Sequence, residues 1–332
     1  MAKLPMTTFT RDLAAVVETL RGPAIYRSQT SLKFARFNRY CLPLLATVAV
    51  IFSGCSLPRI WQTRSVDATG PYRTGKTLAE TQLERILTKQ EKLLNDLSAD
   101  LGEASTFEQQ QKINEVDTAY RSFILDNPEY IYGYILYGKF LRAIGDFETA
   151  NVIFVKANDL EGDYAVIKQQ IGNYLAEEGE YGLALAYFMS AIDLEPKVAL
   201  YHFQLGELLH TYRNAFVAGG ELAADVVARQ QFNAFANAAR LDPDNRTFQM
   251  RYAEAFFDAA QPDWRTALRQ WQALATNPSD EVERQIIELQ KARVHIELDQ
   301  YDAARASLAE VTRASLQTSK QQLLDKIGYP QP

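Results

Sequence analysis

The sequence predicts an all-α protein, a solenoid of stacked helix–turn–helix repeats, on three observations. The segments GDFETANVIFVKANDLE (145–161) and GEYGLALAYFMSAIDLE (179–195) align without a gap at an offset of 34 residues. Apolar residues three and four positions apart give each predicted helix a stripe to bury. The body of the chain has no run typical of strands. A fixed period of this length indicates repeats that stack because none can bury its stripe alone.

Four repeats are predicted within residues 131–282, and a degenerate fifth repeat lies within 283–327. Three of the predicted first helices carry a glycine at the same place, and the matching second helices carry an aromatic residue. These residues are Gly138, Gly172 and Gly206 in the first helices, and Phe154, Phe188 and Phe235 in the second helices. We expect each glycine where the two helices cross closely, and each ring beside it.

An insertion at about 213–226 lengthens the third repeat, within the stretch NAFVAGGELAADVVARQQ (214–231). Insertions in repeat arrays often lie on the binding face. Phe216 and Val217 are therefore candidates either to contact a partner or to cover the solenoid.

Helices are also predicted at both ends of the array. Residues 77–101 place leucines at helical spacing, which suits either a coiled-coil seam for dimerisation or a cap on the first repeat. We favour the cap because the segment holds only about three heptads. Residues 116–128 resemble the second helix of a degenerate repeat, so 77–128 forms an N-terminal helical region. Residues 314–327 are predicted to be a C-terminal capping helix.

The repeats resemble the tetratricopeptide repeat family, whose pattern is W-x2-L-G-x2-Y…A-x3-F…P. The first repeat matches it with Tyr137, Gly138, Leu141, Ala150 and Phe154, and the resemblance covers roughly 131–311. It implies a right-handed solenoid that binds peptides along a concave face lined by the first helices. The resemblance places nine residues on that face: Tyr132, Ile135, Lys139, Arg142, Gln169, Asn173, Phe203, Glu207 and His210.

Within this set, Lys139, Arg142 and Asn173 could clamp a carboxylate or an acidic peptide. The alternative, which we favour, is that these side chains form an ordinary solvated face. The Lys/Asn clamp of chaperone-binding family members is incomplete here, because Gln169 stands where a lysine is expected.

The N-terminal 54 residues are predicted to be a signal peptide. Seven basic and two acidic residues accompany an apolar run, 41–52, that is too short to span a bilayer. The ending Phe52-Ser53-Gly54-Cys55 resembles a bacterial lipobox, which implies cleavage before Cys55 and its lipidation. We hypothesise that translation starts at Leu32, in which case residues 1–31 are not translated. Ser56 follows the cysteine, and by resemblance to Gram-negative lipoproteins this favours the outer membrane, facing the periplasm.

Residues 55–76 are predicted to be a flexible tether, although GPYRTGKT (70–77) fits the phosphate-binding pattern G-x-x-x-x-G-K-[ST]. A phosphate-binding loop needs a buried strand before it, and the preceding residues RIWQTRSVDAT are polar throughout. We therefore expect no nucleotide cofactor, and a nucleotide hydrolase remains the less favoured alternative.

No catalytic or metal-ligating motif stands out. The three histidines, His202, His210 and His295, have no further ligands at metal-binding spacing. The acidic body of the chain would repel nucleic acid. The sequence therefore favours a non-catalytic scaffold that binds segments of envelope proteins and is held at the membrane by a lipid anchor. The alternative is a pilotin-like factor or an accessory factor of outer-membrane assembly or secretion.

Overall fold

The computed structural model describes residues 77–99 and 107–328, and within these ranges it contains helices and no strand. The all-α prediction is confirmed. The predicted signal peptide, Cys55 and residues 70–76 lie outside the described residues. The described residues from 82 onward belong to one compact unit, and residues 77–81 belong to another.

The helices follow one another as α3 (Leu78–Ala99), α4 (Phe107–Asp126), α5 (Ile131–Ala143), α6 (Phe147–Leu160), α7 (Ala165–Glu177), α8 (Tyr181–Leu194), α9 (Ala199–Thr211), α10 (Arg213–Ala218), α11 (Ala224–Leu241), α12 (Arg246–Ala255), a 3-10 turn (Phe256–Asp258), α13 (Trp264–Ala275), α14 (Glu281–Glu297), α15 (Tyr301–Ala309), a second 3-10 turn (Ala314–Leu316) and α16 (Gln317–Ile327).

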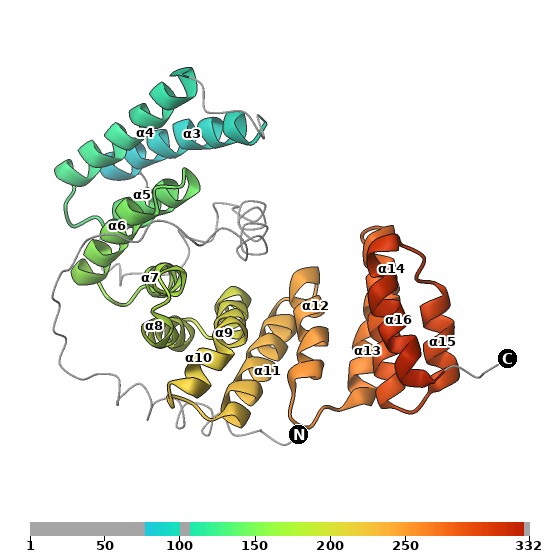
Figure 1. The fold of residues 1–332 in the computed structure, drawn as a ribbon. Coiled ribbons are helices and arrows are strands. Elements are labelled where there is room, and N and C mark those ends of the chain that lie inside the picture. The colour runs from blue at the N-terminus through green and yellow to red at the C-terminus, as the bar shows by residue number, and fades with distance from the viewer. Residues whose placement is uncertain (1–76, 100–106, 329–332) are drawn as a thin grey trace, which may run out of the picture. The chain divides into compact units, whose positions relative to one another are not determined.

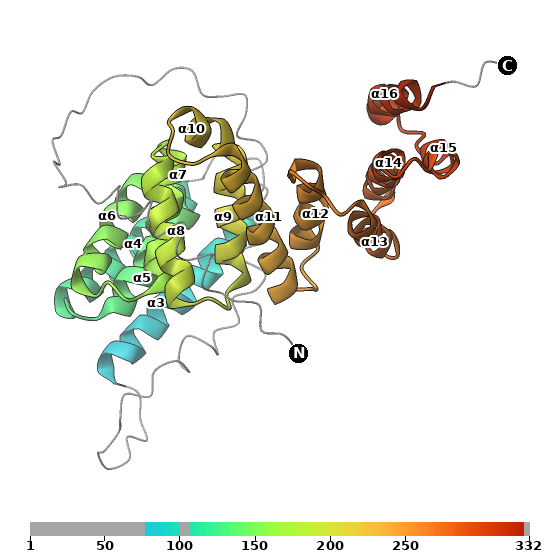
Figure 2. The ribbon, with the colours of Figure 1, turned by 90° about the horizontal axis from the view of Figure 1, so that it is seen from below.

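Five helix pairs form the repeats: α5–α6, α7–α8, α9–α11, α12–α13 and α14–α15. Each pair packs internally, and the second helix of each pair also contacts the first helix of the next. Figure 1 shows this order along the stack, and Figure 2 confirms that α9 and α11 lie side by side although α10 separates them in sequence. The chain is therefore an α-solenoid.

The predicted close crossings are confirmed in the first three repeats. A Cβ atom added to Gly138 would lie 2.7 Å from Phe154 Cζ, and one added to Gly206 would lie 2.6 Å from Phe235 Cε1. At Gly172 the distance to Phe188 would be 3.0 Å. Real Cβ atoms essentially never approach other atoms closer than 3.0 Å. A larger residue at Gly138 or Gly206 would therefore require the facing ring or the helix to shift.

In the first, second and fifth repeats, the turn between the two helices uses one left-handed residue. Gly145 and Gly179 have φ values of +85° and +81°, and each directly precedes the residue that caps the second helix. In the fifth repeat Asp299 holds this place with a φ of 58°. Glycine adopts this backbone conformation without the steric cost that other residues meet.

The insertion of the third repeat covers the solenoid. Phe216, on α10, is fully buried, and its ring lies 4.8 Å from the ring of Tyr181 at the start of α8. Tyr212 stacks on the same tyrosine and donates to the carbonyl of Ala176 on α7. The insertion therefore packs against the second repeat. Of the two candidate side chains Phe216 and Val217, Val217 is the exposed one, at 39%.

The helices at the two ends of the described chain pack against their neighbours. Leu83, Ile86 and Leu93 of α3 are buried, and Gln90 accepts a hydrogen bond from Tyr120 of α4. These apolar positions are therefore buried within the chain, and the capping role of this helix stays a prediction. At the other end, Leu323 buries α16 against α14 and α15.

The helix α3 begins where the sequence stretch GPYRTGKT ends. The Thr77 hydroxyl accepts from the backbone N–H of Glu80, and the Glu80 carboxylate accepts from the N–H of Thr77. This reciprocal capping box fixes the first turn of the helix. Thr77 therefore has a structural role at the helix start.

We predict that Gly206→Val lowers the free energy of unfolding by about 1–3 kcal/mol, because the new side chain overlaps the ring of Phe235. The double variant Gly206→Val with Phe235→Ala should lose less stability than the two single variants lose in sum, because the ring that the valine would overlap is absent. Denaturant titration of the single and double variants measures both effects. Gly162→Ala is the control, because its Cβ would have no neighbour closer than 3.5 Å. Strict additivity of the two changes would contradict the close-crossing explanation.

Candidate functional site

The first helices α5, α7, α9, α12 and α14 follow one another along the stack (Figure 1). We call their exposed and half-exposed sides the first-helix face. All nine side chains that the family resemblance singles out belong to α5, α7 or α9. The structure places these nine in three different situations.

Three of the nine are buried and are not available as surface contacts. Ile135, Gln169 and Phe203 are 5%, 2% and 6% exposed. Each lies three residues before the glycine of its helix, where neighbouring repeats pack together. The ring of Phe203, for example, lies 4.7 Å from that of Phe248 in the fourth repeat. The prediction that these three side chains face a peptide is therefore wrong, because inter-repeat packing covers them.

Three others, Lys139, Arg142 and Asn173, are the residues of the predicted carboxylate clamp. Arg142 already binds a carboxylate, since its guanidinium donates to Glu177 of α7 over 2.7 Å and lies 5.1 Å from the ring of Phe147. Lys139 and Asn173 are half-buried on the same two helices. The structure thus brings the three onto adjacent helices, but the arginine is not an unoccupied anion site.

The remaining three residues are Tyr132 on α5 and Glu207 and His210 on α9. Tyr132 is half-buried and packs edge-on against Tyr164, with ring centres 5.9 Å apart. Glu207 accepts a hydrogen bond from Arg251 of α12, which also contacts Glu254 and lies 4.8 Å from the Phe235 ring.

His210 is exposed and belongs to a polar cluster that joins the third and fourth repeats. Its Nδ1 lies 3.3 Å from Asp258, and the buried Gln231 donates to the same carboxylate over 2.9 Å. Arg213 of the insertion donates to the backbone carbonyl of Asp258. The hydrogen bond with His210 is the main cause that lowers the pKa of Asp258, to about 2. The carboxylate is therefore ionised at neutral pH and ties α9, α10 and α11 to the 3-10 turn.

One polar contact bridges the first helices at every junction between repeats. The four contacts are Arg142–Glu177 at 2.7 Å, Gln169–Gln204 at 2.9 Å, Arg251–Glu207 at 2.5 Å and Arg246–Glu283 at 2.7 Å. The charges on the first-helix face are therefore largely matched within the chain. A ligand meets a polar surface of low net charge, on which each exposed ion pair is worth only about 0–1 kcal/mol.

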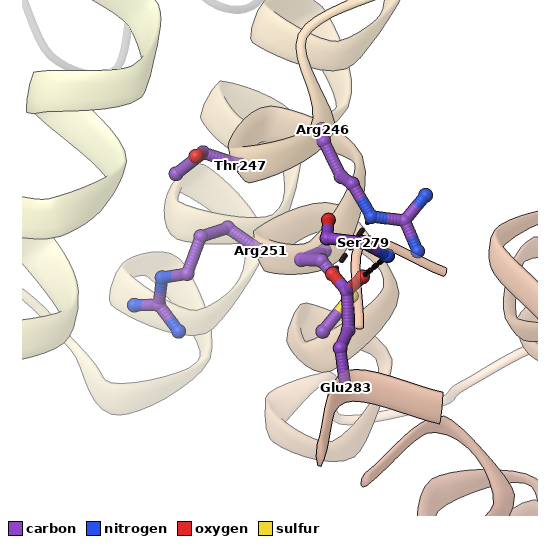
Figure 3. A pocket seen from close by; sticks show the side chains of 6 residues that line it. Arg246, Thr247, Arg251, Ser279 and Glu283 are labelled. Atoms are coloured by element: carbon purple, nitrogen blue, oxygen red, sulfur yellow. Dashed lines mark hydrogen bonds and ion pairs between the residues drawn. The ribbon is translucent and has the colours of Figure 1, made fainter. Parts of the chain in front are cut away.

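The first-helix face contains an open hollow of about 270 Å³ between α12 and the start of α14 (Figure 3). Its lining residues are Arg246, Thr247, Met250, Arg251, Ser279 and Glu283. The Arg246–Glu283 pair and the bond from the Ser279 N–H to Glu283 close one side, while Arg251 points away on the other (Figure 3). Met250 and the aliphatic stems of the arginines supply its apolar surface.

The sequence-based set stopped at His210 and missed this hollow. The fourth repeat has Ala253 and Trp271 where the earlier repeats have glycine and phenylalanine, and both are fully buried in one cluster. Aligning Ala253 with Gly206 would have placed Met250 and Glu254 on the face beside Phe203 and Glu207. The sequence therefore contained the alignment that places Met250 and Glu254. It was missed because the insertion in the third repeat breaks the period of 34 residues.

The histidines show no sign of a metal site within residues 77–99 and 107–328, where no three His, Cys, Asp or Glu side chains are grouped to bind a metal. His202 is buried with its Nε2 2.9 Å from the Pro196 carbonyl, and burial lowers its pKa. His295 contacts Gln300 over 2.7 Å. In the same part of the chain, no helix combines the length and apolar character needed to cross a membrane.

Comparison with known proteins supports the fold. Residues 165–198, which comprise α7 and α8, match the tetratricopeptide repeat family. The solved structure of YrrB, described as a TPR protein with an unusual peptide-binding site, aligns with a TM-score of 0.51 at 15% identity, over 62% of this chain and 96% of YrrB. PilF of Pseudomonas aeruginosa aligns with a TM-score of 0.51 at 13% identity, over 74% of this chain and 99% of PilF. No curated protein sequence matches the chain.

Proposed function

We propose that this protein is a non-catalytic scaffold that binds extended segments of other proteins on its first-helix face. The observation that carries the proposal is the face itself, on which five successive helices present half-exposed polar side chains in register. A tetratricopeptide fold supports protein binding, and the similar structure of YrrB is described as having a peptide-binding site.

The matched charges on this face suggest how a segment is recognised. Because Arg142, Arg251 and Arg246 already have carboxylate partners within the chain, a strong electrostatic clamp is not the main source of affinity. The face instead offers amide and hydroxyl groups, such as Asn173 and Thr247, to the backbone of an extended segment. Binding of this kind tolerates varied sequences and depends weakly on salt.

Photo-cross-linking in the native host tests the face directly. We predict that p-benzoylphenylalanine at Asn173 or His210 yields covalent adducts with the same partner protein. The control position is Gln272, an exposed residue of the second helix α13, which should yield no such adduct. Mass spectrometry of the adducts identifies the partner. Adducts at Gln272 but not at Asn173 or His210 would show that the binding surface lies elsewhere.

We further propose that the solenoid is held at the outer membrane through a lipidated Cys55, facing the periplasm. The support is the sequence alone: an apolar run, small residues and a cysteine in lipobox order, followed by Ser56. Attachment through two or more acyl chains gives stable anchoring. A tether of this kind raises the local concentration of envelope proteins at the first-helix face.

The mass of the native N-terminal peptide tests the anchor. We predict that it begins at a diacylated or triacylated Cys55, and that Cys55→Ser moves the protein out of the membrane fraction. Cys41→Ser is the matched control and should leave both the mass and the fractionation unchanged. An unmodified chain that retains residues 1–54 would contradict the anchor and would place the protein in another compartment.

A further inference from the structure

One arginine of the first helices has no carboxylate partner, which sets it apart from the arginines already described. Arg142, Arg246 and Arg251 each form an ion pair within the chain. Arg293, on α14, is exposed, and no hydrogen bond or ion pair joins it to another residue within 77–99 or 107–328. Its guanidinium carbon lies 3.8 Å from the centre of the Phe257 ring. The arginine is therefore held by an aromatic ring and keeps its charge unmatched.

The register of the repeats places this pair on the first-helix face. Arg293 directly follows the small residue of its helix crossing, which is the position of Asn173 in the second repeat. Phe257 lies four residues after the small residue of the fourth repeat, which is the position of His210 in the third repeat. The contact between the two side chains therefore joins the fourth and fifth repeats on the face that we propose for segment binding.

The acidic residues closest to this pair in sequence do not neutralise the arginine. Glu254 and Asp258, on either side of Phe257, already accept hydrogen bonds from other residues of the chain. Glu297 lies one helical turn after Arg293, a spacing at which ion pairs often form on helices. The arginine nevertheless contacts the ring of Phe257 and forms no ion pair with Glu297. A carboxylate from outside the chain would therefore meet a guanidinium that no acid of the chain occupies.

The contact with the ring favours a carboxylate as the ligand. A guanidinium has five N–H donors in one plane, and a carboxylate can accept two parallel hydrogen bonds from this fork. Contact with Phe257 limits how far the arginine can swing, so binding a ligand costs less conformational freedom. The ring of Trp264 lies 5.6 Å from that of Phe257, and both rings are half-buried. The site therefore offers a cation beside apolar surface, which suits an acidic group with its neighbouring CH₂ groups.

We propose that Arg293, held against Phe257, is an anchor for one carboxylate group of the bound segment. This inference rests on the proposed binding of extended segments to the first-helix face, and it adds a chemical requirement at the fifth repeat. The guanidinium donates to the carboxylate oxygens, while the CH₂ groups next to them lie against the aromatic rings. A neutral amide of the same shape receives weaker hydrogen bonds, because its bonds to the guanidinium involve only one charged partner.

Peptide titration separates charge from shape. The full chain is titrated with Ac-Gly-Gly-Glu-Gly-Gly-amide and with its glutamine counterpart, and saturation-transfer NMR on the peptide signals measures binding. The glutamate peptide should bind about three- to five-fold more tightly, which is the range expected for one exposed ion pair. The free-acid peptide Ac-Gly-Gly-Gly-Gly-Gly-OH distinguishes the source of the carboxylate. Binding as tight as that of the glutamate peptide assigns the anchor to a C-terminus, and weaker binding assigns it to an acidic side chain.

Variants of the full chain provide the second arm. Arg293→Gln should abolish the preference for glutamate, and Arg293→Lys should keep only part of it, because an ammonium lacks the planar fork. Phe257→Leu should also reduce the preference, since the released guanidinium can pair with Glu297, and adding Glu297→Gln should recover part of the loss. The matched control is Lys156→Gln, which removes an exposed cation that lies over the ring of Tyr134 on the second helix α6 and should change nothing.

Three results would refute the anchor. They are equal binding of the glutamate and glutamine peptides, no binding of either peptide, and a preference for glutamate that survives Arg293→Gln. The cross-linking experiment decides the scaffold function separately. Adducts at Asn173 and His210 together with any of these three results would leave the scaffold function in place without the anchor.

Discussion

The stack depends on one packing contact, a small residue of the first helix against an aromatic ring of the second. Gly138, Gly172 and Gly206 each leave room for a buried phenylalanine that a Cβ atom would strike. Glycine within a helix costs roughly 0.5–1 kcal/mol relative to alanine. The sequence retains it because the close approach lets each repeat bury a whole ring, and the same geometry sets how the next repeat lies on it.

A second layer of contacts fixes the joints between repeats. One ion pair or amide pair bridges consecutive first helices at each junction from α5 to α14, and the Asp258 cluster adds a further tie beside the insertion. These bonds use the polar groups that would otherwise be free to bind a charged ligand. The surface left for a partner is therefore polar, and its ion pairs are matched within the chain.

The fold could be predicted from the sequence because its determinants are local and periodic. Glycine and phenylalanine recur at fixed spacing, and Gly145 and Gly179 mark equivalent turns. The candidate site could be predicted only in part. Burial of Ile135, Gln169 and Phe203 depends on the neighbouring repeat, which the pattern within one repeat does not show. Met250 was missed because the insertion disrupts the period and because Ala253 and Trp271 replace the usual glycine and phenylalanine.

The most direct test of the account is a crystal structure of the full chain bound to a segment of the partner identified by cross-linking. The account predicts an extended segment that lies across α7, α9 and α12, with its backbone near Asn173 and Thr247. The first-helix ion pairs should persist in the complex, since they fix the joints. A segment bound to the outer sides of α6, α8 or α13, or an opened Gly206–Phe235 crossing, would contradict it.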